Sequence, residues 1–227
     1  MTAPQMMKRE LIVENLRRQI LSGELQRGAR MRQDDLARQF SASITPVREA
    51  LRLLEAEGLL VSEPHRGARV AGVRLDQIKA TYIVRRLVES YAMQRATTRL
   101  SLRDLNMARA MMEKMEALSE EGDVETFRAD NRAFHFFFYD RCGMPSLSEQ
   151  IFGMWQAFPW DLMLVTPERT QQSHLEHIEI FRALEAADVE GVAAATEAHI
   201  AEGFNAIAAQ LSGSKEPVPD PFLLDVD

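Results

Sequence analysis

The sequence predicts a mainly α-helical protein in which a small domain of three helices and a β-hairpin precedes an antiparallel six-helix bundle. Three observations support this prediction. Apolar residues recur at helical spacing through most of the chain, two short alternating runs flank a turn between residues 59 and 72, and no convincing strand follows Leu75. We therefore expect two domains, residues 1–74 and 75–211, and a mobile tail, residues 212–227.

The distribution of charge supports the same boundary. Residues 1–74 carry 13 Lys and Arg against 9 Asp and Glu, net +4, whereas residues 75–227 carry 14 against 25, net −11. A basic small domain joined to an acidic larger one suits a phosphate-binding module attached to a module that does not bind DNA. No apolar run approaches the roughly 18 residues of a membrane span. With a single cysteine, Cys142, and no apolar signal segment, we expect a cytoplasmic protein without a membrane partner.

The first two helices are indicated by apolar spacing and by their ends. In KRELIVENLRRQILSGEL, Val13, Leu16 and Ile20 share one face, and Gly23 is a natural C-cap. After the turn QRGARM, the segment QDDLARQF begins with two aspartates, which the positive end of a helix dipole favours. These segments therefore predict two helices joined by a short turn.

The third helix is expected within SITPVREALRLLEAEGLL. Its apolar stripe, at spacing i, i+3, i+4 and i+7, consists of Val47, Ala50, Leu51 and Leu54. Thr45, Arg48 and Arg52 share the opposite face, which suits a polyanion. Ser43 or Thr45 can cap the start of the helix, and Gly58 ends it.

The run LLVSEPHRGARVAGV after this helix predicts a β-hairpin. Its two short strands are LLVS and ARVAG, and they flank a turn at Glu63 to Gly67. A hairpin in this position is the wing of a winged helix-turn-helix domain. Its tip places His65, Arg66 and Gly67 where they can reach phosphates or the adjacent minor groove.

Together these segments resemble the winged helix-turn-helix domain of the GntR family of bacterial transcriptional regulators, through ILSGEL, DDLARQF, TPVREALRLLEAEGL and RGARV in that order. The resemblance implies a homodimer that binds double-stranded operator DNA through the second and third helices and the wing. It also implies the side chains that contact DNA: Ser43, Thr45, Arg48, Arg52, His65, Arg66 and Gly67. The alternative for Arg48 is an ordinary ion pair with Glu49 or Glu55 on a solvated helix face.

The chain departs from the family at Ile44, where the family usually has an arginine that pairs with guanine. Isoleucine donates no hydrogen bond, so a contact worth about 1–3 kcal/mol of base discrimination is missing. We therefore expect the operator to differ at that position. Ile44 either touches a thymine methyl group or packs against Val61 or the wing.

Six helices are expected in the second domain. The breaks between them fall near Ser101, Gly122, Gly143, Pro167 and Asp188. Their expected ranges are 76–99, 102–120, 123–142, 146–163, 169–187 and 189–211. The last helix is rich in alanine, which allows a neighbouring helix to approach closely. This pattern is typical of an antiparallel helical bundle, and it contains no glycine-rich phosphate loop.

Four of the five histidines lie on three helices of the predicted bundle. Asn131 and His135 are spaced i, i+4 and project from one helix face, and His174 and His177 are one turn apart on another helix. His199 comes from the last helix. Considered singly, each is more often an ordinary hydrogen-bonded or surface histidine. Three helices that aim imidazoles at one point can also hold a divalent metal.

The segments NRAFH, HIEIFRALEAAD and AHI resemble the FCD ligand-sensing domain of the FadR-like subfamily of GntR regulators. The resemblance implies a divalent metal of the Zn, Ni or Mn class at the base of an effector pocket. It assigns the ligands to Asn131, His135, His177 and His199. Asn131 stands where the family usually has Asp, and because an amide adds no charge we expect weaker metal binding. His174 is an alternative ligand.

Arg85 occupies the place where the FCD family has an arginine facing the effector pocket. A guanidinium beside a metal suits a small carboxylate effector. The alternative is an ion pair between Arg85 and Glu89. The sequence thus predicts a sequence-specific DNA-binding regulator, a repressor controlled by a small carboxylate, and not an enzyme.

The rival hypothesis is a metal-dependent enzyme that uses the histidines of the bundle. This hypothesis explains the histidines but not the third helix or the wing. It also needs a base, and the two carboxylates that flank His177, Glu176 and Glu179, are expected to point to other faces of their helix.

Overall fold

The computed structural model describes residues 3–63, 67–163, 166–212 and 218–223. The chain forms two compact units. One contains the residues up to Val73 together with Ala157–Asp161, and the other contains the rest of the chain from Arg74 onward. None of the helices that the structure describes combines the length and the apolar character that crossing a membrane requires.

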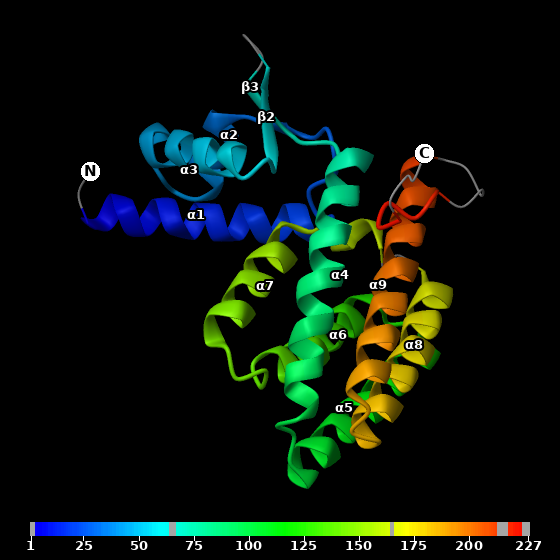
Figure 1. Ribbon diagram of the computed structural model, residues 1–227. Coiled ribbons are helices and arrows are strands. Elements are labelled where there is room, and N and C mark those ends of the chain that lie inside the picture. The colour runs from blue at the N-terminus through cyan, green and yellow to red at the C-terminus, as the bar shows by residue number, and fades with distance from the viewer. Residues whose placement is uncertain (1–2, 64–66, 164–165, 213–217, 224–227) are drawn as a thin grey trace. The chain divides into compact units, whose positions relative to one another are not determined.

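The first unit contains three helices and a three-stranded antiparallel sheet (Figure 1). In chain order the elements are α1 (Ala3–Leu21), β1 (Arg30–Met31), α2 (Gln33–Gln39), α3 (Ile44–Ala56), β2 (Leu60–Glu63) and β3 (Gly67–Val70). The predicted hairpin is confirmed, with Leu60 opposite Val70. Strand β1 was not predicted; it pairs with the free edge of β3, with Met31 opposite Ala68.

The predicted apolar stripe of α3 forms the centre of the first core. Val47, Ala50, Leu51 and Leu54 are all buried, and α3 packs against the buried face of α1. The helix ends at Ala56, because Gly58 takes a φ of +75° that side-chain-bearing residues rarely adopt. The chain then turns so that Leu60 enters β2. One face of α3 is thereby fixed against the core, and the opposite face is exposed.

The second unit contains the six predicted helices. They are α4 (Leu75–Thr97), α5 (Leu102–Glu121), α6 (Val124–Tyr139), α7 (Pro145–Ala157), α8 (Pro167–Glu185) and α9 (Val189–Ser212). Helix α7 ends six residues before the predicted position, and a short 3₁₀ turn, Trp160–Leu162, follows it. The physical reason is Pro159, because the residue before a proline is disfavoured in helical conformation.

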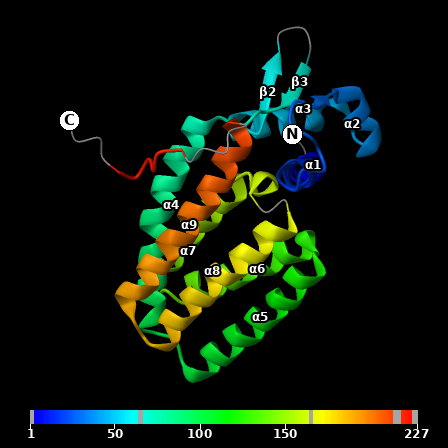
Figure 2. The ribbon, with the colours of Figure 1, turned by 90° about the vertical axis from the view of Figure 1, so that its right-hand side faces the viewer.

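In the second unit, helices that are far apart in the sequence pack side by side. Helix α9 packs along both α4 and α8, α5 packs along α6 and α8, and α6 also contacts α4 and α8 (Figure 2). Part of the predicted tail also lies against α4, where Arg86 donates to the Asp220 carboxylate at 3.0 Å and stacks on the ring of Phe222.

We expect Leu54→Ala to destabilise the first unit by about 2–5 kcal/mol, because it opens a cavity in a closed core. Leu54 is 0% exposed, whereas its neighbour Leu53 is 41% exposed. The control Leu53→Ala should therefore change the free energy of unfolding by no more than about 0.5 kcal/mol. Urea unfolding followed by circular dichroism measures both variants. Equal effects would show that the face of α3 assigned to the core is wrong.

Candidate functional site

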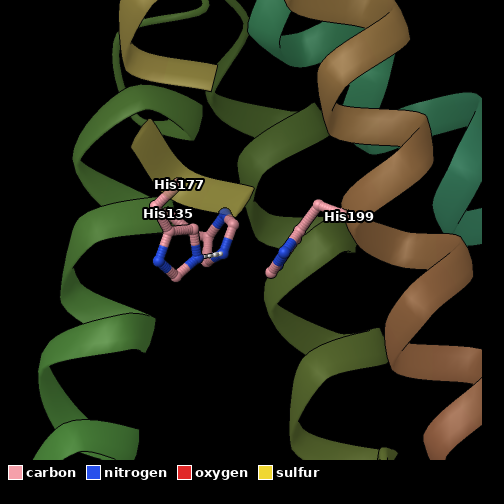
Figure 3. Close-up of side chains that lie close together, drawn as sticks. All are labelled: His135, His177 and His199. Carbon is pink, nitrogen blue, oxygen red and sulfur yellow. Dashed lines mark hydrogen bonds between the residues drawn. The ribbon is translucent and has the colours of Figure 1, made fainter. Parts of the chain in front are cut away.

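Three histidine side chains meet in the interior of the second unit. His135 projects from α6, His177 from α8 and His199 from α9, and Figure 3 shows the imidazoles of the three helices converging. All three are buried, and one nitrogen from each lies within 4.8 Å of the others. No other group of three or more histidine, cysteine or carboxylate side chains approaches this closely in the described part of the chain.

The distance between two of these imidazoles suits either a hydrogen bond or a shared cation. Nε2 of His135 and Nε2 of His177 are 3.1 Å apart. Two nitrogen ligands about 2.1 Å from one ion and at right angles to each other are separated by roughly 3 Å. Two unprotonated nitrogens that face each other at this distance repel, so either a proton or a cation must lie between them.

Burial keeps two of the imidazoles neutral. The pKa of His135 lies well below its usual value because of burial, with smaller effects from His199 and Arg85. Burial likewise holds the pKa of His177 well below its usual value, aided by the neighbouring histidines and by Arg169. Neutral imidazole is the form that binds metals. The site therefore presents ligand nitrogens at neutral pH.

His199 is oriented by a carboxylate that the sequence analysis placed elsewhere. Nδ1 of His199 lies 2.7 Å from Oε2 of Glu176, and Arg169 donates two hydrogen bonds to the same carboxylate, at 3.1 and 3.2 Å. Burial raises the pKa of Glu176, but His199 and Arg169 lower it by more, so its pKa is below the usual value. An ionised carboxylate only accepts hydrogen bonds. Nδ1 of His199 therefore carries a proton, which leaves Nε2 as the ligand atom.

Glu176, which was expected to point to another face of α8 than His177, contacts a histidine of a different helix. Glu176 does point away from His177 along α8, but α9 packs against that side of α8 and brings His199 to it. Only a weak sequence signal could have predicted this contact. Glu176 is next to His177 in the sequence, and α8 packs against α9, the helix that carries His199.

His135 is connected to a second carboxylate through a tyrosine. The hydroxyl of Tyr139 lies 3.4 Å from Nδ1 of His135 and donates to Oε2 of Glu89 at 2.8 Å. Arg85 forms a two-point ion pair with Glu89 at 2.6 and 3.2 Å, and the indole of Trp155 donates to Glu89 at 3.0 Å. The structure thus contains the ion pair that was the alternative for Arg85.

The structure distinguishes the two remaining ligand candidates. Asn131 is buried one turn before His135, and its Oδ1 has no hydrogen-bond partner among the described residues. A buried amide oxygen without a partner is costly unless a cation or water contacts it. His174 is not part of the cluster; it lines a cavity of about 280 Å³ between α5 and α8, together with Glu116 and Phe181.

The predicted DNA-binding face of α3 is exposed. Ser43, Thr45, Arg48 and Arg52 are all exposed, and Ser43 occupies the N-cap position without a capping hydrogen bond from its side chain. Arg48 contacts Gln33 at 3.5 Å, and no described carboxylate pairs with Arg48 or Arg52. The alternative pairing of Arg48 with Glu49 or Glu55 is therefore not present in the described residues.

The structure describes only some of the other residues predicted to contact DNA. Gly67 begins β3, whereas His65 and Arg66 lie outside the described residues. Ile44 is half-buried and is not one of the side chains packed against the core of the first unit. By contrast with Arg48, Arg38 on α2 pairs with Asp35 at 2.5 Å. Arg48 and Arg52, which have no described carboxylate partner, lie on α3.

Comparison with known proteins identifies both units. Residues 8–70 match the bacterial regulatory proteins of the gntR family, and residues 80–202 match the FCD domain. The HTH-type transcriptional regulator McbR of Escherichia coli (strain K12) is 34% identical over 186 residues, which cover 80% of this chain and 84% of McbR. A probable D-xylose utilization operon transcriptional repressor of Paenarthrobacter nicotinovorans is 30% identical over 188 residues, 81% of each chain.

A solved structure, "E. coli McbR/YncC", has the same fold. It matches with a TM-score of 0.75 at 28% identity and covers 93% of this chain and 100% of that chain. The likeness therefore extends over both units of the described structure.

The buried histidines should make the metal-free protein less stable as the pH falls. The pKa values of His135 and His177 are lowered in the folded state, whereas in the unfolded chain they lie near 6.5. Below about pH 6.5 the unfolded chain binds more protons, so stability is lost as the pH falls, by up to about 1.4 kcal/mol per pH unit for each histidine.

Urea unfolding in the presence of a chelator, at steps from pH 7.5 to 5.5, measures this dependence. The variant His177→Asn removes one of the titrating groups and should show a smaller slope than the wild type. Stability that stays constant or rises as the pH falls would contradict the assignment of neutral, buried imidazoles.

Proposed function

Because this chain belongs to the GntR family of bacterial transcriptional regulators and carries an FCD domain, we propose that it is a repressor that responds to a small carboxylate through a metal centre. That it is a DNA-binding transcription regulator and not an enzyme follows from its family. The effector, the metal and the homodimer are the proposed part. The single observation that carries the proposal is the buried cluster of His135, His177 and His199.

The DNA-binding step is assigned to the exposed face of α3 and to the wing. Arg48 and Arg52 have no described carboxylate partner, and together with Thr45 and Ser43 they can contact phosphates and base edges in a major groove. We assign Ile44 to an apolar contact with a base, such as a thymine methyl group, since it does not pack against the core. His65, Arg66 and Gly67 remain assigned to the DNA backbone or minor groove.

The sensing step is assigned to the histidine cluster. His135, His177 and His199 would hold a divalent ion of the Zn, Ni or Mn class, with Asn131 as a fourth, neutral ligand. A bound ion would supply a Lewis acid for an effector carboxylate. Three features support the assignment: the convergent nitrogens, the neutral state of two imidazoles, and the amide oxygen of Asn131 without a hydrogen-bond partner among the described residues.

Arg85 is proposed as the second contact of the effector carboxylate. Its guanidinium is held by Glu89, so an incoming carboxylate competes with an internal one. Effector binding can thereby alter contacts of α4, the helix that follows the DNA-binding unit in the chain. We propose that two copies of the chain act together as a homodimer, so that such a change alters how the two DNA-binding units engage an operator.

DNA recognition is tested on the DNA upstream of the protein's own gene. We expect a gel shift that resists competitor DNA at moderate salt. Arg48→Ala and Arg52→Ala should each weaken binding by about 1–3 kcal/mol if they contact bases. Arg182→Ala is the matched control, because Arg182 is an exposed arginine of the helical unit that pairs with Glu179. Equal loss in the control, or a wild type without sequence preference, would contradict the proposal.

The metal centre is tested by elemental analysis of protein purified without chelator. We expect about one divalent ion per chain in the wild type and loss of the ion in His177→Ala. His174→Ala is the matched control, since His174 is buried on the same helix but lies outside the cluster. DNA affinity should persist in His177→Ala while the response to carboxylates is lost. Equal metal content in both variants would rule out this centre.

A further inference from the structure

The hydroxyl of Tyr139 lies between a ligand of the proposed metal centre and a buried carboxylate. It is 3.4 Å from Nδ1 of His135 and 2.8 Å from Oε2 of Glu89. All three side chains are buried, so within this network their hydrogen bonds are not exchanged with bulk water. The direction of each hydrogen bond can therefore be worked out from the groups that meet there.

Glu89 is the acceptor in each of its hydrogen bonds among the described residues. Arg85 donates to both carboxylate oxygens, and the Trp155 indole, which has no acceptor, donates to Oε1. The ion pair with Arg85 favours the ionised carboxylate, which has no proton to give. The proton in the contact between Tyr139 and Glu89 must therefore belong to Tyr139. A tyrosine hydroxyl is protonated at neutral pH, so it has this proton to donate.

The hydrogen bond to His135 then has only one possible direction. Since the proton of Tyr139 is committed to Glu89, its oxygen can only accept from His135. Nδ1 of His135 therefore carries the proton, and Nε2 presents its lone pair to His177 at 3.1 Å. Without metal, His177 must donate from its own Nε2. This agrees with Nδ1 of His177, which has no hydrogen-bond partner among the described residues.

We propose that Glu89 is a positioning residue of the metal centre, which acts through Tyr139 to fix the tautomer of His135 with Nε2 free for the ion. The inference rests on the proposed metal centre and names a regulatory connection within it. Outer partners of this kind orient metal-binding histidines and raise their basicity. Glu89 lies on α4, which begins two residues after Val73. Through Glu89, the proposed metal centre is linked to α4, the helix that follows the DNA-binding unit in the chain.

The first test is the tautomer of His135, read from ¹⁵N chemical shifts of the full-length, metal-free protein. In the wild type we expect the proton on Nδ1. Tyr139→Phe removes the acceptor while it retains the ring and the ion pair between Arg85 and Glu89. The proton of His135 should then move to Nε2, where it can donate to His177. The control Tyr91→Phe removes an exposed hydroxyl that contacts Arg95 and should leave the tautomer unchanged.

Substitution of Glu89 is expected to reverse the direction of the hydrogen bonds that connect it through Tyr139 to His135. In Glu89→Gln, the amide oxygen is expected to face Arg85 Nε and Trp155, so that the amide nitrogen faces Tyr139. Tyr139 would then accept from the amide and donate to Nδ1 of His135, which again places the histidine proton on Nε2. Because this variant removes the carboxylate of a buried ion pair, it can fail to fold. The conclusion therefore depends on Tyr139→Phe, whose folding is checked by its thermal unfolding midpoint.

The second test is the affinity for Zn²⁺, measured by competition with a chelating dye. We expect Tyr139→Phe to bind Zn²⁺ about 10- to 100-fold more weakly than the wild type and Tyr91→Phe to bind equally well. A folded Tyr139→Phe with an unchanged His135 tautomer would overturn this inference, whether or not Zn²⁺ binds. A wild type that binds no divalent ion would instead overturn the proposed metal centre, and the tautomer would still decide the role of Glu89.

Discussion

The constraint on which the helical unit depends is the burial of polar groups where α4, α6, α8 and α9 meet. Two Arg–Glu pairs lie there: Arg85 with Glu89, which is buried, and Arg169 with Glu176, which is partly buried. Removing such pairs from water costs several kcal/mol per ion, and apolar replacements are often as stable. Their presence is understandable if each pair holds a histidine in a defined orientation. The polar groups of this interior therefore fix the orientation of the histidines at the expense of stability.

The two units use arginine in opposite ways. In the helical unit the guanidinium of Arg85 is buried in a two-point ion pair, where its flat fork of donors fixes the orientation of a carboxylate. On α3, Arg48 and Arg52 are exposed without a described carboxylate partner. Unpaired cations on a rigid helix are poised for phosphates and bases, and long-range attraction increases their encounter rate with DNA.

Features that depend on local periodicity were predictable, and those that depend on packing were not. The stripe of α3 and the i, i+4 pair Asn131 and His135 follow from helical geometry, and all of these residues are buried. Strand β1 has two residues, too few for any alternation, and exists because β3 offers an unpaired edge. Glu89 and Tyr139 are 50 residues apart, so only the packing of α4 on α6 brings them together.

The amide of Asn131 affects the charge balance of the proposed metal centre as well as its affinity for metal. The imidazoles of His135 and His177 are neutral, and the charges of Glu89 and Glu176 are offset by their arginine partners. A divalent ion held there would bring a charge that the amide of Asn131 cannot reduce, which is costly in a buried site. An anionic ligand would offset that charge at once. The proposed site would therefore bind metal and carboxylate together, so that each raises the affinity for the other.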